Sequence, residues 1–300
     1  MSPSPETLLT CPVCNSNQTF FSLKIKDHSV SGEFFDVFEC PQCSLRFTKD
    51  APSDDKIGRY YQSENYISHS NTRKGLVNSL YHMVRNRTLA TKLHLLQEKT
   101  GLQQGHHLDI GAGTGAFVQY MNKRDWESTG IEPDPTAREM AKTNHQTILL
   151  PAESFEQFFP ESFDAISLWH VLEHVHNLYP YLNQIKKILK PHGLAFIAVP
   201  NYTSYDGMKY GSNWAAYDVP RHLYHFSPDS VKWMLKTAGL ILADEIPMWW
   251  DSFYISLLSE KYKNGRGSLL NGFISGSVSN MKAFSDREKC SSLIYVVQKA

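Results

Sequence analysis

Between residues 105 and 200, short apolar stretches alternate with amphipathic ones along the chain. The short stretches contain many β-branched residues and predict buried strands: HHLDIG, ESTGIEP, QTILLP, FDAISLW and GLAFIAVP. The stretches between them repeat apolar residues at helical spacing: AFVQYMNKR, PTAREMAKTN and PYLNQIKKILK. Strands that alternate with helices of about 10 residues predict a parallel sheet with helices on both faces.

Capping residues and prolines predict where several helices begin and end. Asp134-Pro135 and Ser227-Pro228 each place a capping side chain before a proline, which is typical of a helix start. Pro191-His192-Gly193 predicts the end of the helix before it. A helix is also expected from Gly75 to Gln97, and further strands at GLILADEIP and SSLIYVVQK. The fold class is therefore α/β, with an open twisted sheet.

The charge balance of the chain carries no signature of a nucleic-acid partner. Its 300 residues include 30 basic and 30 acidic ones, for a formal net charge of zero. No apolar run approaches the roughly 18 residues of a membrane span. The first residues, MSPSPETLLTCPVC, lack the charged and apolar regions of a signal peptide. We therefore expect a cytoplasmic protein with reduced cysteines.

Cysteines are concentrated near the start of the sequence. Four of the five lie in two short motifs, Cys11-Pro-Val-Cys14 and Cys40-Pro-Gln-Cys43. In a reducing compartment, two such pairs are typical of a closed, structural Zn²⁺ site with four thiolate ligands. The residues between the pairs alternate as in a hairpin, with Phe34, Phe35 and Phe38 as a small core.

These patterns divide the chain into regions. We expect a zinc-ribbon-like module at residues 1–50, a linker and helical region at 51–104, and the α/β domain at 105–300. The linker contains Tyr60, Tyr61 and Tyr66, whose rings either cover a bound substrate or pack between the domains. An insertion at about residues 247–290 is rich in aromatic residues and is a lid, a dimer face or plain packing.

The stretch LDIGAGTG joins a predicted strand to a predicted helix. Gly111, Gly113 and Ala116 match the dinucleotide fingerprint G-x-G-x-x-G/A, but a third glycine, Gly115, comes one position early. Asp109 also precedes the loop, and a carboxylate there is unfavourable beside a pyrophosphate and favourable beside a cation. S-adenosylmethionine fits this loop, since it carries a sulfonium and an ammonium but no phosphate.

Further motifs follow the glycine loop in a recognisable order. GIEPD places Glu132 at the end of the second strand, where a carboxylate can bind both ribose hydroxyls, and PAESFEQF and SFDAISLWHVLEHV come next. Over about residues 85 to 245, the sequence resembles the class I S-adenosylmethionine-dependent methyltransferases, in particular the branch with the ubiquinone-pathway O-methyltransferases. This resemblance implies a Rossmann-like, seven-stranded, mostly parallel sheet. The predicted cofactor contacts are Asp109, Gly111, Gly113, Gly115, Glu132, Ala152, Glu153 and Trp169.

Candidate catalytic residues directly follow the fourth predicted strand: His170, Glu173 and His174. Methyl transfer mainly requires alignment, and a hydroxyl acceptor also benefits from a base or a metal. Some similar enzymes, including small-RNA 2′-O-methyltransferases, hold a divalent ion with such a Glu-His pair. His170 stands where those RNA enzymes have a second glutamate, which argues against Mg²⁺. For Glu173 and His174, a structural role, a general base and a divalent metal site remain open.

The expected acceptor is a small molecule, a sugar or a lipid-linked compound, methylated on oxygen or carbon. Its pocket is predicted in the loop after the fifth strand, at Trp214, Tyr217, His222 and His225. The four-cysteine module ahead of the domain also resembles the layout of some sugar C-methyltransferases. An RNA methyltransferase that uses the zinc module to bind its substrate is the first alternative, although residues 1–50 carry four basic and six acidic residues. The second is an NAD-dependent oxidoreductase or a non-catalytic cofactor-binding protein.

Overall fold

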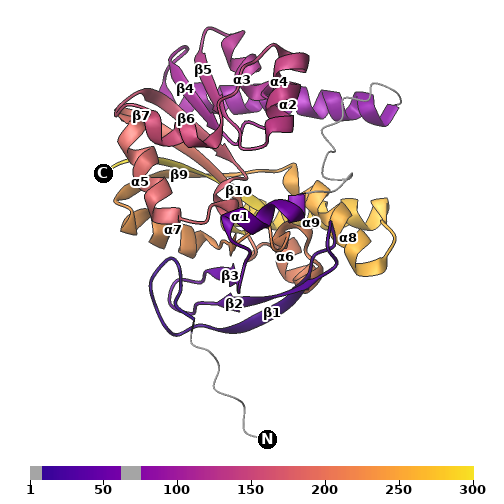
Figure 1. Ribbon diagram of the computed structural model, residues 1–300. Coiled ribbons are helices and arrows are strands. Elements are labelled where there is room, and N and C mark those ends of the chain that lie inside the picture. The colour runs from indigo at the N-terminus through magenta and orange to yellow at the C-terminus, as the bar shows by residue number, and fades with distance from the viewer. Residues whose placement is uncertain (1–8, 62–75) are drawn as a thin grey trace, which may run out of the picture. The chain divides into compact units, whose positions relative to one another are not determined.

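The computed structural model describes residues 9–61 and 76–300, with side chains from residue 88 onward in the second of these ranges. The described chain forms two compact units (Figure 1). The first unit contains residues 9–61, 170–179 and 198–295, and the second contains 76–169, 180–197 and 296–300. The domain boundaries expected near residues 50 and 104 stay predictions.

The α-helices of the described chain are α1 (Asp54–Ile57), α2 (Leu76–Thr100), α3 (Ala116–Asn122), α4 (Pro135–His145), α5 (Leu178–Ile188), α6 (Tyr205–Tyr210), α7 (Pro228–Thr237), α8 (Asp251–Asn264) and α9 (Leu269–Ser285). Helices α2, α3, α4, α5 and α7 lie close to segments for which helices were expected. Short 3₁₀ turns occupy Gly58–Tyr61, Ala152–Gln157, Leu172–His174, Gly211–Asn213, Ala215–Tyr217 and Arg287–Lys289. Among the described residues, no helix is both long enough and apolar enough to cross a membrane.

The strands form two sheets. They are β1 (Phe20–Lys26), β2 (Phe34–Glu39), β3 (Arg46–Thr48), β4 (His106–Ile110), β5 (Glu127–Ile131), β6 (Phe163–Trp169), β7 (Leu189–Pro200), β8 (Tyr224–His225), β9 (Leu240–Pro247) and β10 (Ser292–Lys299). The larger sheet has the order β5-β4-β6-β7-β10-β9, and the smaller one the order β1-β2-β3-β8.

The second unit has the expected parallel arrangement. Strand β4 pairs in parallel with β5 on one side and with β6 on the other. Its residues 107–110 are buried, because neighbouring strands flank them and helices such as α3 pack nearby. The carboxyl ends of β4, β5 and β6 therefore come together at one edge, where open α/β sheets bind ligands. The prediction of an α/β, Rossmann-like fold is confirmed.

Two details of the sequence prediction are wrong. The sheet has six strands in the described chain instead of seven, because residues 146–151 contribute only one parallel bridge, from Leu150 to Ile131. The helix before Pro191 ends at Ile188, and β7 already starts at Leu189. Residues 193–200 of LKPHGLAFIAVP form a continuous buried run in the sheet, and this tertiary contact outweighs the local turn signal of Pro-His-Gly.

The first unit is built around the smaller sheet. Strands β1 and β2 form the predicted antiparallel hairpin, and Asp27 closes its turn by accepting hydrogen bonds from the N–H groups of Ser29, Val30 and Ser31. The expected small core is only partly right, since Phe38 is buried but Phe34 is exposed. Strand β8, far along the chain, pairs with β3, which itself pairs with β2, and so joins the loop after β7 to the sheet that contains the hairpin.

A buried arginine holds this loop in place. Arg221 is fully buried and pairs with Asp27 of the hairpin at 3.0 Å and with Asp218 at 2.5 Å. It also donates a hydrogen bond to the carbonyl oxygen of Tyr60. The first unit is therefore tied together by charge as well as by strand pairing.

Candidate functional site

The glycine loop has a backbone that favours glycine at each of its three positions. Gly111, Gly113 and Gly115 have φ values of 70°, 54° and 72°, in the left-handed region. A Cβ added to Gly113 would meet no atom within 4 Å, so open space lies directly beside the main chain there. The loop follows β4 and precedes α3, as expected. It therefore leaves room for a ligand against the backbone.

Two buried carboxylates lie beside this loop. Asp109 is buried in β4, and burial raises its pKa to about 6, although the Ser167 hydroxyl donates a hydrogen bond to it at 2.5 Å. Burial also raises the pKa of Glu132, which accepts a hydrogen bond from the N–H of Gly113 at 2.7 Å. The hydrogen bond holds the Glu132 side chain at the loop. Burial disfavours the ionised form of both acids, and a cation or hydroxyl donors beside them would offset this cost.

Trp169 lies at the end of β6 with its ring beneath a positive charge. The Lys92 amine lies 4.1 Å from the centre of the indole ring, and Phe117 contacts the ring edge-on. The indole Nε1 is buried and has no hydrogen-bond partner among the described residues. Ala152 and Glu153 are exposed in the 3₁₀ turn that follows the Leu150 bridge. The cofactor contacts assigned to these residues stay predictions.

His170, the first residue after β6, is held between two acids. It has a positive φ of 59°, its Nε2 lies 2.9 Å from Asp251 Oδ2, and its Nδ1 lies 3.4 Å from Glu173 Oε1. Burial alone would lower its pKa, but Asp251 and Glu173 together raise it to about 10. His170 is therefore a cation at neutral pH and cannot accept a proton.

Glu173, His174 and His222 form a compact group. Each offers one potential ligand atom, and these atoms lie within 4.8 Å of one another. Glu173 is fully buried, and neither of its oxygens accepts a hydrogen bond from the described residues. Burial would raise the pKa of Glu173, but the neighbouring histidines, His170 foremost, lower it. The group thus presents an ionised carboxylate beside two imidazoles.

The hydrogen bonds of the two imidazoles define their tautomers. His174 Nδ1 lies 2.9 Å from the carbonyl oxygen of Arg221, and His222 Nδ1 lies 2.8 Å from that of Ala216. Because a carbonyl oxygen only accepts, each Nδ1 carries a proton and donates it to its carbonyl partner. Burial lowers the pKa of His174 to about 4, so it is neutral at physiological pH. The Nε2 atoms of the two rings are therefore the ones left to bind a proton or a metal.

The structure adds partners that the sequence pattern did not reveal. The Tyr61 hydroxyl lies 3.0 Å from His174 Nδ1, and Asp251, at the start of α8, pairs with His170. His222, predicted as an acceptor contact, lies close to Glu173 and His174. Only spatial proximity identifies these contacts, since Tyr61 and Asp251 are far from residues 170–174 in sequence. Tyr66 lies outside the described residues.

The other predicted acceptor residues are packed inside the first unit. Trp214 and Tyr217 belong to a buried cluster with Ile25 and Val37 of the hairpin. The Trp214 indole N–H donates to Asp206, and the Tyr217 hydroxyl accepts from Arg46. His225 lies opposite Arg46 in the pairing of β8 with β3, and its Nε2 forms a hydrogen bond with the Thr48 hydroxyl. Their role in an acceptor pocket stays a prediction.

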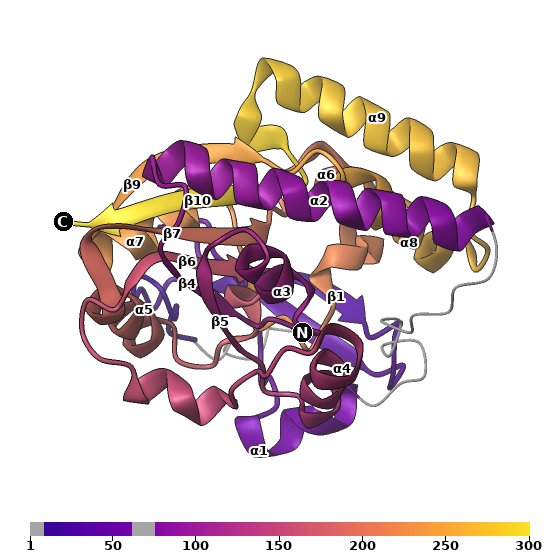
Figure 2. The ribbon, with the colours of Figure 1, turned by 90° about the horizontal axis from the view of Figure 1, so that it is seen from above.

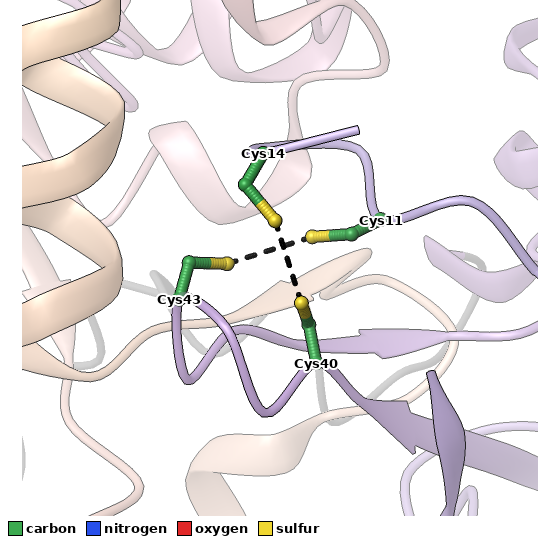
Figure 3. Close-up of side chains that lie close together, drawn as sticks. All are labelled: Cys11, Cys14, Cys40 and Cys43. Atoms are coloured by element: carbon green, nitrogen blue, oxygen red, sulfur yellow. Dashed lines mark hydrogen bonds between the residues drawn. The ribbon is translucent and has the colours of Figure 1, made fainter. Parts of the chain in front are cut away.

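The four N-terminal cysteines converge on one point (Figure 3). Their sulfur atoms lie 3.5 Å apart for Cys11 and Cys43 and 3.4 Å apart for Cys14 and Cys40, and none of them forms a disulfide. Cys11, Cys40 and Cys43 are buried. Four thiols that point at one another in this way have the donor set and the closed geometry of a structural metal site.

The parallel strands β4, β5 and β6, with an open glycine loop after β4 and an acid after β5, define a Rossmann-like α/β fold. A family model described as "Methyltransferase domain" matches residues 81–244, more than half of the chain. The chain belongs to this family.

The sequence is also similar to curated methyltransferases over part of their length. Ubiquinone biosynthesis O-methyltransferase from Glaesserella parasuis is 31% identical over 149 residues, which cover 45% of this chain and 63% of the relative. The enzyme of the same name from Rhodopseudomonas palustris is 26% identical, over 46% of this chain and 59% of the relative. The chain thus spans about three fifths of the length of these relatives.

Among solved structures, a SAM-dependent methyltransferase from Archaeoglobus fulgidus aligns with 79% of this chain and 100% of its own length. The alignment has 16% sequence identity and a TM-score of 0.48.

Proposed function

We propose that this chain is an S-adenosylmethionine-dependent methyltransferase that acts on a small-molecule, sugar or lipid-linked acceptor. The pair of buried acids beside the open glycine loop carries this proposal. A pyrophosphate would add negative charge next to Asp109 and Glu132, whereas a sulfonium nucleoside offers a cation and ribose hydroxyls. Membership of the methyltransferase-domain family supports the same cofactor.

The chain's own residues would perform three tasks in this reaction. The open main chain at Gly113 would accept the cofactor, and Glu132, already fixed by the Gly113 N–H, would bind the ribose hydroxyls. Asp109 would offset positive charge in its ionised form. When bound, S-adenosylmethionine supplies a methyl group with a good leaving group, so alignment contributes much of the rate.

A hydroxyl acceptor must also lose a proton, and Glu173, His174 and His222 suit this task. We infer that they hold a divalent cation. Two imidazoles that each donate Nδ1–H to a backbone carbonyl, together with an ionised carboxylate, are typical of metal ligands and their outer partners. This nitrogen-rich set favours Mn²⁺, Fe²⁺, Co²⁺ or Zn²⁺ over Mg²⁺. When bound, such an ion lowers the pKa of a coordinated hydroxyl.

We also propose that the four cysteines hold a structural Zn²⁺ ion. Their converging sulfur atoms and burial favour a closed site with no position for water or substrate. The zinc would therefore stabilise the hairpin and not take part in methyl transfer.

Metal content separates the proposed roles. The purified protein should contain two equivalents of metal, one at the cysteines and one at Glu173, His174 and His222. His222→Ala should retain one equivalent, while His192→Ala, which removes an exposed histidine, should retain both. One equivalent in the unaltered protein would reject the second metal and leave His174 as a candidate general base.

Cofactor binding and turnover test the function itself. Calorimetry should show binding of S-adenosylmethionine and not of NAD, and a labelled-methyl transfer screen against cell extract should identify the recipient by mass. His174→Ala should lower turnover by about a hundredfold or more, the scale of acid–base catalysis, with cofactor affinity unchanged. Binding of NAD alone would overturn the proposed function, and unchanged turnover would exclude His174 from acceptor activation.

A further inference from the structure

Helices α8 and α9 lie side by side and form a hairpin within the first unit (Figures 1 and 2). The buried face of α9 consists of small residues: Gly272, Ser275, Gly276, Ser279 and Ala283. A Cβ at Gly272 would come within 2.7 Å of Leu257, and one at Gly276 within 2.7 Å of Phe253. The two helices are therefore packed closely, and α9 has no room for large side chains on its inner face.

The large apolar side chains of α9 point outward instead. The exposed ones are Leu269, Leu270, Phe273, Ile274, Met281 and Phe284. Phe273 is 61% exposed and Phe284 78% exposed, although a helix of a water-soluble domain normally turns such residues inward. Spacings of three, four and seven residues put Leu270, Phe273, Ile274 and Met281 on one stripe. We call these six residues the outer face of α9.

Aromatic residues of α8 extend this surface. The ring of Phe253 stacks on that of Phe273 and also contacts Trp250, which is 60% exposed. Tyr254 is exposed as well. Tryptophan and tyrosine are enriched at membrane–water interfaces, because each combines an apolar ring with a polar group.

The turn between α8 and α9 is basic, and the first acidic residue after it, Asp286, lies beyond the end of α9. From residue 261 to 285 the sequence has four basic residues, Lys261, Lys263, Arg266 and Lys282, and no acidic one. All four are exposed, and the first three flank the turn between the helices. The chain as a whole has a net charge of zero, so this is a local excess of positive charge. An isologous dimer through this face would bring like charges together.

We propose that the outer face of α9 and the basic turn dock the protein on an anionic phospholipid bilayer. The apolar side chains enter the boundary between headgroups and acyl chains, and the lysines and arginine contact lipid phosphates. Helix α9 has 17 residues and lies in the plane of the interface instead of spanning it. This inference rests on the hairpin alone and does not depend on the proposed methyl transfer.

Vesicle co-sedimentation of the full chain tests the proposal. Vesicles of phosphatidylcholine with phosphatidylglycerol should bind the protein about tenfold or more better than pure phosphatidylcholine, and added salt should weaken the binding. The double variant Leu270→Ser/Phe273→Ser should lose at least about tenfold in partitioning, because it removes exposed apolar surface that the bilayer would bury. The triple variant Lys261→Gln/Lys263→Gln/Arg266→Gln should lose the preference for anionic lipid.

Matched controls use residues of equal exposure elsewhere. Phe159→Ser removes an apolar side chain that is 81% exposed, and Lys123→Gln/Lys142→Gln removes exposed charges. Both controls should bind vesicles like the unaltered protein. Equal losses in the controls, or no binding to anionic vesicles, would overturn the proposal. So would a dimer in light scattering that Phe273→Ser dissociates, or a large fall in melting temperature in that variant, since the face would then be an interface or core.

Discussion

Asp109 illustrates how one buried side chain can link cofactor binding to pH. The raised pKa of about 6 means that its negative charge is costly inside the sheet, and the nearby charged groups are Lys92 on α2 and Glu132 after β5. A cationic ligand would favour the ionised form. Asp109 is therefore the residue at which the proposed cofactor and the proton compete.

Binding of S-adenosylmethionine should weaken as the pH falls through about 6. The dissociation constant should rise by up to about tenfold per pH unit below that value, because the neutral carboxyl no longer attracts the cation. Calorimetry across this pH range should show the change, with Asp109→Asn giving a weaker and flatter profile. Glu132→Gln should keep the Asp109-dependent slope. An unchanged slope in Asp109→Asn would assign the titration to another group.

The ligand-free protein should respond to pH in the opposite direction. The folded pKa of Asp109 exceeds the unfolded value of 3.8, so its contribution to stability is fully present below about pH 4 and is lost as the pH rises through about 6. The opposite signs of the two effects distinguish a change in binding from a change in folding.

At the scale of elements, the Arg221 ion pairs connect the β1–β2 hairpin to the loop that carries His222. Arg221→Met should lower the free energy of unfolding by about 3–5 kcal/mol, because it leaves the carboxylates of Asp27 and Asp218 without their buried counterion. Lys24→Met, which removes an exposed partner of Asp36, should change stability by less than about 0.5 kcal/mol. Urea denaturation measures both, and equal effects would show that Arg221 has no special structural role.

Local sequence patterns predicted those elements that short motifs define, such as capped helix starts and glycine turns. The Asp134 cap accepts a hydrogen bond from the Thr136 N–H, and Ser227 forms a capping box with Ser230, as their positions before proline indicated. The left-handed glycines of the loop likewise follow from their spacing. In contrast, the pairing of β3 with β8 joins residues nearly 180 positions apart, and no periodicity encodes such a contact.

The same limit applies to the candidate site. Glu173 and His174 were found as neighbours in a motif, but the third member of their group, His222, lies on a distant loop. The ion pair from His170 to Asp251 depends on where α8 begins, inside an insertion whose fold the sequence left open. The motif therefore identified residues that can bind a metal or transfer a proton, whereas only the tertiary fold showed which side chains they contact.

At the scale of the whole molecule, the cysteine cluster should determine whether the first unit folds. The hairpin between the two cysteine pairs contributes Ile25 and Val37 to the core that holds Trp214 and Tyr217. Strand β3, which follows the second cysteine pair and pairs with β2 of the hairpin, also pairs with β8. Loss of metal should therefore destabilise residues far beyond the hairpin, because these contacts depend on its fold.

Removal of zinc should lower the melting temperature. A strong chelator, or Cys40→Ser, should cost about 3 kcal/mol or more, which corresponds to roughly 6–12 °C for a domain of this size. Cys290→Ala, at a buried cysteine outside the cluster, should keep the cysteine-bound metal. Calorimetric unfolding with parallel metal analysis measures both quantities. If Cys40→Ser lost its zinc and kept its melting temperature, the hairpin would fold without metal, and its packing against Trp214 and Tyr217 would alone be sufficient to hold the unit together.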